Sequence, residues 1–106
     1  MIEWKERGAA HMKLTVDPEA ARWYKQELNL HEGDQLRVFV RLGGCGSVQP
    51  GLSLGIMKDE SRRPGLRQEE EGLVFFMEED QLWYLDGKEL HLRYDSAQDE
   101  AFMDVY

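Results

Sequence analysis

The chain has 106 residues, of which 42% are hydrophobic, and this is enough for one small domain but not for two. Its 13 Lys and Arg against 21 Asp and Glu give a net charge of −8, which opposes binding to phosphate backbones and anionic lipid headgroups. The single cysteine cannot form an internal disulfide, and no apolar run approaches the ~20 residues of a membrane-spanning helix. We therefore expect a cytoplasmic protein with neither a nucleic-acid nor a membrane partner, whose thiol stays reduced.

The first coherent pattern of the chain begins at Met12. Residues 1–11 mix polar and apolar side chains without a clear period, and we interpret them as a leader, either an extension or the remnant of a cloning junction. A single domain is expected over residues 12–106.

Asp17, Pro18 and Glu19 predict the start of a helix that runs to about Leu30. Asp17 can accept a hydrogen bond from a free N–H of the first turn, and Pro18 suits the first helical position. Apolar residues recur at helical spacing on one side of this segment: Ala21, Tyr24 and Leu28. The helix is therefore expected to cover a sheet with this side.

Residues 36–42 show the clearest strand pattern, because every second residue is Leu or Val. Residues 52–56 repeat the alternation, and residues 73–77 form a nearly continuous apolar run. Residues 58–71 are polar and contain a Pro-Gly breaker, which predicts a solvated connecting loop rather than a site.

The dipeptide Asp86-Gly87 accepts the positive φ angles of a type I′ turn, so residues 81–85 and 89–94 are expected to form a hairpin around it. Residues 101–106 alternate weakly and predict a last strand. One helix followed by five or six strands points to a mainly β, α+β fold. The expected architecture is an antiparallel β-rich barrel or sandwich capped by one N-terminal helix.

The glycine-rich loop at residues 43–47 has a composition that core and turn requirements do not explain. Four small residues surround Cys45: Gly43, Gly44, Gly46 and Ser47. They leave no large side chain to shield the sulfur, which makes Cys45 the candidate metal ligand, and Arg41 could favour its thiolate. The alternative is a plain turn that holds a small, inert cysteine. No second cysteine or histidine follows at the spacing of a zinc or redox motif.

Several short motifs resemble the HesB-like, or A-type, iron–sulfur cluster biogenesis domain. They are Leu14-Thr15 before the helix, Leu36-Arg37-Val38 leading to Gly43-Gly44-Cys45, Tyr84-Leu85-Asp86-Gly87, and Ala101-Phe102 near the end. The resemblance covers about residues 14–102. It implies a HesB-like fold, iron or an iron–sulfur cluster as the cofactor, and iron–sulfur assembly proteins as partners.

The chain departs from that family in its ligands. Gly46-Ser47 reverses the family's Ser-Gly order, and the family's C-terminal Cys-Gly-Cys pair is missing from a sequence that ends at Tyr106. A [2Fe-2S] cluster takes about four protein ligands, so a cluster here needs two chains and further ligands.

We therefore expect a non-catalytic protein related to iron–sulfur cluster assembly or iron binding, with Cys45 as its only soft ligand. Such a chain is expected to form a weak or metal-assisted homodimer. The alternative is a metal-free protein-interaction module with the same fold and no cofactor.

The remaining candidates are more simply structural. His31 at the helix exit is expected to complement the helix dipole, and His91 to form a solvated pair on an exposed strand face. An acidic cluster is expected to be solvated, with hard-metal contact as the alternative: Asp95, Asp99, Glu100 and Asp104. Because Trp83 and Tyr84 are adjacent in an expected strand, one of them must face outward, where it could form an apolar surface with Phe39.

Overall fold

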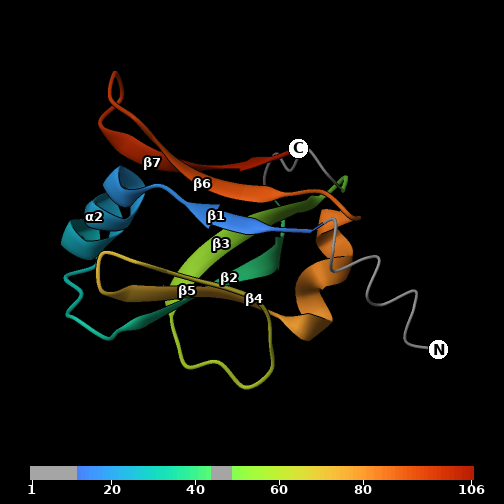
Figure 1. Ribbon diagram of the computed structural model, residues 1–106. Helices are drawn as coiled ribbons and strands as arrows, with labels where there is room; N and C mark the ends of the chain where they lie inside the picture. Colours follow the sequence, from blue (N-terminus) through green and yellow to red (C-terminus); the bar gives the residue numbers. More distant parts are fainter. Residues whose placement is uncertain (1–11, 44–48) are drawn as a thin grey trace.

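The computed structural model describes residues 12–43 and 49–106, which form two β-sheets, one α-helix and a 3-10 helix (Figure 1). The elements in chain order are β1 (Leu14–Val16), α2 (Pro18–Glu27), β2 (Gln35–Leu42), β3 (Leu52–Lys58), β4 (Pro64–Glu70), β5 (Leu73–Glu78), η1 (Glu79–Leu85), β6 (Leu90–Asp95) and β7 (Glu100–Val105). The helix α2 lies at one end of the sheets and η1 at the other. The prediction of a mainly β fold with one N-terminal α-helix is confirmed.

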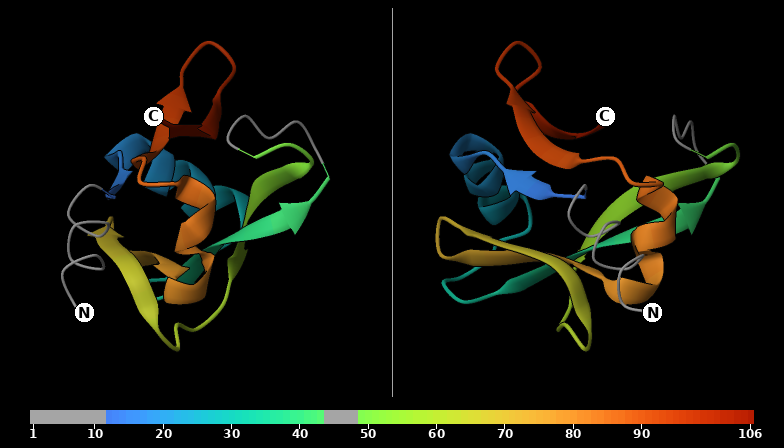
Figure 2. Two further views of the ribbon diagram at one scale, coloured as in Figure 1. Left: turned by 90° about the vertical axis from the view of Figure 1, so that its right-hand side faces the viewer. Right: turned by 45° about the vertical axis from the view of Figure 1, so that its right-hand side comes forward.

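The strands form two mixed sheets that face each other (Figure 2). The three-stranded sheet has the order β1-β6-β7, and the four-stranded sheet has the order β3-β2-β5-β4. Most pairs are antiparallel as expected, but β1 runs parallel to β6 and β2 runs parallel to β5, because alternation within a strand does not reveal the direction of its neighbour. Each sheet has two outer strands in the described part of the chain, so the arrangement is open and sandwich-like rather than a closed barrel.

The core lies between the two sheets and α2. Leu36 and Val38 of β2 are fully buried, as their alternation predicts, and belong to one apolar cluster with Phe75 of β5 and Leu92 of β6. Burying each such side chain contributes about 1.5–3 kcal/mol. Leu42 continues the same alternating series but is 86% exposed, because the β2–β3 hairpin extends past the core.

The helix ends at Glu27 rather than at Leu30. Asn29 adopts a left-handed conformation with a φ of 53°. Its N–H donates to the Gln26 carbonyl, and the Leu30 N–H donates to the Lys25 carbonyl at 2.8 Å. These two bonds form a Schellman-type helix end, for which asparagine is suited.

Residues 81–85 belong to η1, so the hairpin expected around Asp86-Gly87 is wrong. Tyr84 and Leu85 are both buried while Trp83 is 55% exposed, and a strand would place neighbouring side chains on opposite faces. Asp86 and Gly87 do have positive φ angles of 52° and 79°, but they end a 3-10 helix. The strand after them, β6, pairs with β1 and β7 instead.

Residues 64–70 form β4, so the prediction of a solvated loop is wrong for this part of the 58–71 segment. β4 runs antiparallel to β5 at the edge of its sheet. Its polar composition suits an edge, where Arg67 and Glu69 form an ion pair at 2.9 Å. Glu71 and Gly72, with φ angles of 53° and 78°, join β4 to β5. Glu71-Gly72 therefore closes the hairpin between β4 and β5.

Candidate functional site

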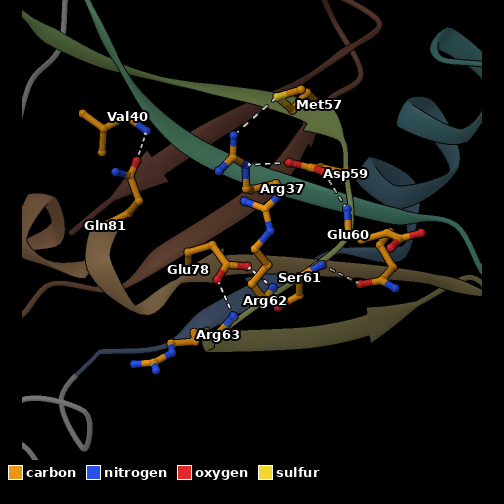
Figure 3. Close-up of polar contacts among 11 residues, drawn as sticks. Arg37, Val40, Met57, Asp59, Glu60, Ser61, Arg62, Arg63, Glu78 and Gln81 are labelled. Carbon is orange, nitrogen blue, oxygen red and sulfur yellow. Dashed lines mark hydrogen bonds and ion pairs between the residues drawn. The ribbon is translucent and has the colours of Figure 1, made fainter.

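A buried carboxylate organises the outer face of the four-stranded sheet. Glu78, at the end of β5, is only 8% exposed. Its two carboxylate oxygens accept hydrogen bonds from the backbone N–H groups of Arg62 and Arg63, at 2.9 and 2.6 Å (Figure 3). Burial would raise the pKa of Glu78, but these bonds and the nearby Arg37 charge outweigh it and hold the pKa below its usual value. The ionised Glu78 thus ties the β3–β4 loop to β5.

Arg37 of β2 lies near the Glu78 carboxylate, and its side chain extends toward β3. Its Nε atom is 3.3 Å from Oδ2 of Asp59, and an Nη atom is 3.8 Å from Sδ of Met57 (Figure 3). Its guanidinium carbon is also 5.7 Å from the centre of the Phe39 ring, within the range of a cation–π contact. Arg37 therefore holds the loop, β3 and Phe39 together on one face.

An open hollow of about 420 Å³ lies beside Glu78. Three arginines line it, Arg37, Arg62 and Arg63, together with five carboxylates that include Glu78 and Asp59. Because the carboxylates outnumber the arginines and the most buried one is already hydrogen-bonded, the hollow offers no net attraction for an anion. Its side chains serve mainly to anchor the loop.

Gln81 of η1 replaces a missing strand neighbour. β5 ends at Glu78, so on the side opposite β3 the backbone of β2 beyond Val38 has no strand beside it in the described part of the chain. The Val40 N–H instead donates to Oε1 of Gln81 at 2.7 Å. This bond satisfies a backbone group that would otherwise lose its partner.

Most of the predicted cysteine site lies outside the described residues, namely Gly44, Cys45, Gly46 and Ser47. Gly43 is described: its φ is 90°, and its N–H donates to the Gly51 carbonyl at 2.8 Å. The assignment of Cys45 as a metal ligand, and of iron or a cluster as cofactor, stays a prediction.

His91 is paired with a residue far away in the sequence. Its Nε2 atom lies 2.7 Å from Oδ1 of Asp17, and its side chain is 19% exposed rather than fully solvated. Asp17 makes no side-chain bond to the first turn of α2, so the capping role expected for it is wrong. Asp17 instead links the start of α2 to β6.

His31 lies in the turn after α2, beyond the helix end at Glu27 rather than in the last turn of the helix. Its backbone N–H donates to Oδ2 of Asp34 at 2.8 Å. This bond holds the pKa of Asp34 below its usual value, and the nearby Lys58 charge acts in the same direction. Burial opposes both, but its effect is smaller than that of the bond. The pair closes the turn that leads into β2.

The carboxylates of the C-terminal cluster mainly have partners of their own. Asp99 accepts a short hydrogen bond from the Tyr94 hydroxyl, which is the main cause of the raised pKa of Tyr94. Asp104 pairs with Arg93 at 3.3 Å, and Asp95 accepts the Ala97 N–H at 2.9 Å. Among residues 12–43 and 49–106, no three His, Cys, Asp or Glu side chains are grouped to hold a metal ion.

Of the two adjacent aromatic residues, Trp83 faces outward and is 55% exposed, whereas Tyr84 is 2% exposed. Phe39 is half-buried on the outer face of β2 and lies over Gly55, where an added Cβ would come within 2.8 Å of its Cζ atom. No helix in the described ranges is long and apolar enough to cross a bilayer.

Comparison with known proteins gives a different relationship from the expected one. No family model matches the sequence. The chain is 47% identical over 89 residues to a protein named pyruvate dehydrogenase inhibitor from Bacillus subtilis (strain 168), across 84% of this chain and 94% of that protein. It is 33% identical over 92 residues to an uncharacterized protein of Staphylococcus saprophyticus, with the same coverage. A further uncharacterized protein, from Staphylococcus haemolyticus, is 29% identical over 82 residues.

These relatives overturn the HesB-like assignment and, with it, the iron–sulfur assembly function and the assembly partners. The motifs behind that assignment are short, and the structure gives one of them an ordinary role: Asp86 and Gly87 supply the positive φ angles that end η1. The high identity over nearly the whole length of the Bacillus protein is far more specific than such motifs. The chain belongs to the family of the Bacillus subtilis pyruvate dehydrogenase inhibitor.

Proposed function

We propose that this chain is a non-catalytic protein that binds pyruvate dehydrogenase and inhibits it. The observation that carries this proposal is the 47% identity over 94% of the length of a relative named as such an inhibitor. An inhibitor of this kind needs a stable surface, and the contacts around Arg37 and Glu78 support the proposal by holding the β3–β4 loop firmly against the sheet.

The exposed apolar side chains also favour a role in binding. Leu42, Trp83 and Met57 are 86%, 55% and 40% exposed. Interfaces between proteins are enriched in Trp and Met compared with the rest of the surface. These side chains provide apolar area that contact with a partner would remove from water, at about 25 cal/mol per Å².

Titration of the purified chain into Bacillus subtilis pyruvate dehydrogenase tests the proposal. The rate of pyruvate oxidation is expected to fall with added chain and to recover on dilution, because the complex is non-covalent. A variant with a core substitution that unfolds the chain, Val38→Asp, controls for nonspecific effects and is expected not to inhibit. An unchanged rate with excess folded chain would contradict the proposal.

A further inference from the structure

One edge of the four-stranded sheet is open along β3 beyond Leu52, whose carbonyl accepts the Tyr84 hydroxyl at 3.5 Å. The sheet order places β3 outermost, with no strand beyond it among the described residues. The Val40 N–H points away from β3, toward Gln81, and backbone direction alternates along a strand. The N–H and C=O groups of Phe39, and of every second residue from it along β2, therefore bond to β3. Their partners on β3, such as Gly55, direct their own N–H and C=O groups back to β2. The N–H and C=O groups of Leu54 and Ile56 therefore face the open edge.

The other outer strands of the described sheets carry features that protect an edge from pairing. β4 begins at Pro64, has a register irregularity there and carries several charged side chains. β7 carries Glu100 and Asp104, and β1 has only 3 residues. β3 has 7 residues, no proline, and a single charged residue at its end, Lys58. Its edge is the least protected one in the described structure.

The side chains next to this edge are cationic, although the whole chain has a net charge of −8. A Cβ added to Gly55 would lie 3.2 Å from Cδ of Arg41, so the Arg41 side chain crosses β3 where Gly55 leaves room. No carboxylate in the described ranges forms an ion pair with Arg41. Arg37, on the same face, leans toward Met57 of β3 but is already paired with Asp59. A strand added beside β3 would therefore meet the positive charge of Arg41 on this face.

We propose that the β3 edge receives an extended, acidic segment of the protein partner as an added strand. This inference rests on the proposed function and names the surface that carries it. Backbone bonds to Leu54 and Ile56 would hold the segment, and a carboxylate on its outer face would pair with Arg41. A second copy of this chain fits less well, because each copy carries a charge of −8.

Backbone hydrogen exchange tests the added strand directly. In the free chain, the edge-facing amides of Leu54 and Ile56 are expected to exchange fast. In complex with Bacillus subtilis pyruvate dehydrogenase, they should slow at least about tenfold, whereas the outward-facing amide of Ala101 on β7 should not. Protection that instead rises with the concentration of the chain alone would show pairing with a second copy and would overturn the inference.

Two pairs of variants complete the test by measuring inhibition and binding. Ile56→Pro removes an edge N–H without removing a bond to β2, and is expected to weaken binding at least about tenfold. Ala101→Pro makes the matching change at the β7 edge and should stay within about twofold. Arg41→Glu should weaken binding about tenfold, and Lys13→Glu, which makes the same charge change at another exposed residue, should stay within about twofold.

The outcomes separate the inference from the proposed function. If the wild-type chain inhibits but the Leu54 and Ile56 amides stay unprotected and Arg41→Glu inhibits normally, the β3 edge is the wrong surface and the proposed function stands. If the wild-type chain does not inhibit, the proposed function fails and this inference fails with it. Should Ile56→Pro not fold, the exchange data and Arg41→Glu decide.

Discussion

β3 and β4 are the outer strands of one sheet, yet β4 is fastened at its start and β3 is open along its edge. The two N–H groups that lead into β4, those of Arg62 and Arg63, bind the buried carboxylate of Glu78. On its free side β3 is held at Leu52, whose carbonyl accepts the Tyr84 hydroxyl at 3.5 Å, but Leu54 and Ile56 further along have no such bond among the described residues. Arg41 lies across the strand, and no carboxylate in the described ranges forms an ion pair with it. We conclude that changes near β4 should act mainly on stability, and changes near β3 mainly on binding.

Removing the Glu78 carboxylate should have the largest effect on stability. Glu78→Ala leaves two backbone N–H groups without their acceptor near the sheet, which should lower the free energy of unfolding by about 2–3 kcal/mol. Urea denaturation of the variant measures this loss. The control is Glu69→Ala, which breaks only the exposed ion pair with Arg67 and should cost less than about 0.5 kcal/mol. Equal losses for both variants would contradict a special role for Glu78.

Substitutions at two glycines should separate the effects of β4 on stability from those of β3 on binding. A Cβ at Gly65 of β4 would lie 2.6 Å from Cδ1 of Leu82 and 3.0 Å from the backbone Cα of Glu79. A Cβ at Gly55 of β3 would meet only side-chain atoms, of Phe39 and Arg41, which can move. Gly65→Ala should therefore cost about 2 kcal/mol in stability, and Gly55→Ala about 1 kcal/mol or less.

Inhibition by these two variants should follow the opposite order. Gly55→Ala displaces the Arg41 and Phe39 side chains and should weaken inhibition several-fold, while Gly65→Ala should inhibit normally once its folded fraction is taken into account. Thermal melting and inhibition measured on the same samples give both quantities. If Gly65→Ala weakens inhibition more than Gly55→Ala, then β4 rather than β3 faces the partner.

Acid should weaken the hydrogen bonds from the Arg62 and Arg63 N–H groups to Glu78 by protonating its carboxylate. Because the folded pKa of Glu78 lies below its unfolded value, its contribution to stability is fully present above the unfolded pKa and is lost as the pH falls through the folded one. The stability difference between wild type and Glu78→Gln should therefore shrink below about pH 4.3. Urea denaturation between pH 7 and pH 3 measures it, and a difference that grows toward low pH would contradict the assignment.

The strands with a regular pattern could be predicted from the sequence, and the elements defined by distant contacts could not. β2 buries one face and β5 buries nearly its whole length, so the pattern of apolar residues predicts both strands. β4 lies at an edge and is mostly polar, which made it indistinguishable from a loop. In η1, an Asp-Gly dipeptide with positive φ angles ends a 3-10 helix, although the same dipeptide often closes a hairpin.

The contacts of the candidate site were hidden for the same reason. Glu78 ends an apolar run, and this is the one local sign of a buried carboxylate. Its partners, Arg62 and Arg63, precede it by 16 and 15 residues, across β4 and the turn to β5, and no spacing rule links them to it. The bond between Asp17 and His91 joins residues 74 positions apart. The family relationship rests on similarity spread along nearly the whole chain, which short motifs in a single sequence do not reveal.

The most direct test of the central claim is a measurement of bound chain and enzyme activity on the same sample. Bacillus subtilis pyruvate dehydrogenase would be mixed with increasing amounts of the chain and separated by size, and each fraction would be assayed for bound chain and for pyruvate oxidation. We expect activity to fall in proportion to the fraction of enzyme that carries the chain. Full activity in enzyme that carries the chain, or no bound chain at saturating concentration, would show that the chain is not an inhibitor of this enzyme.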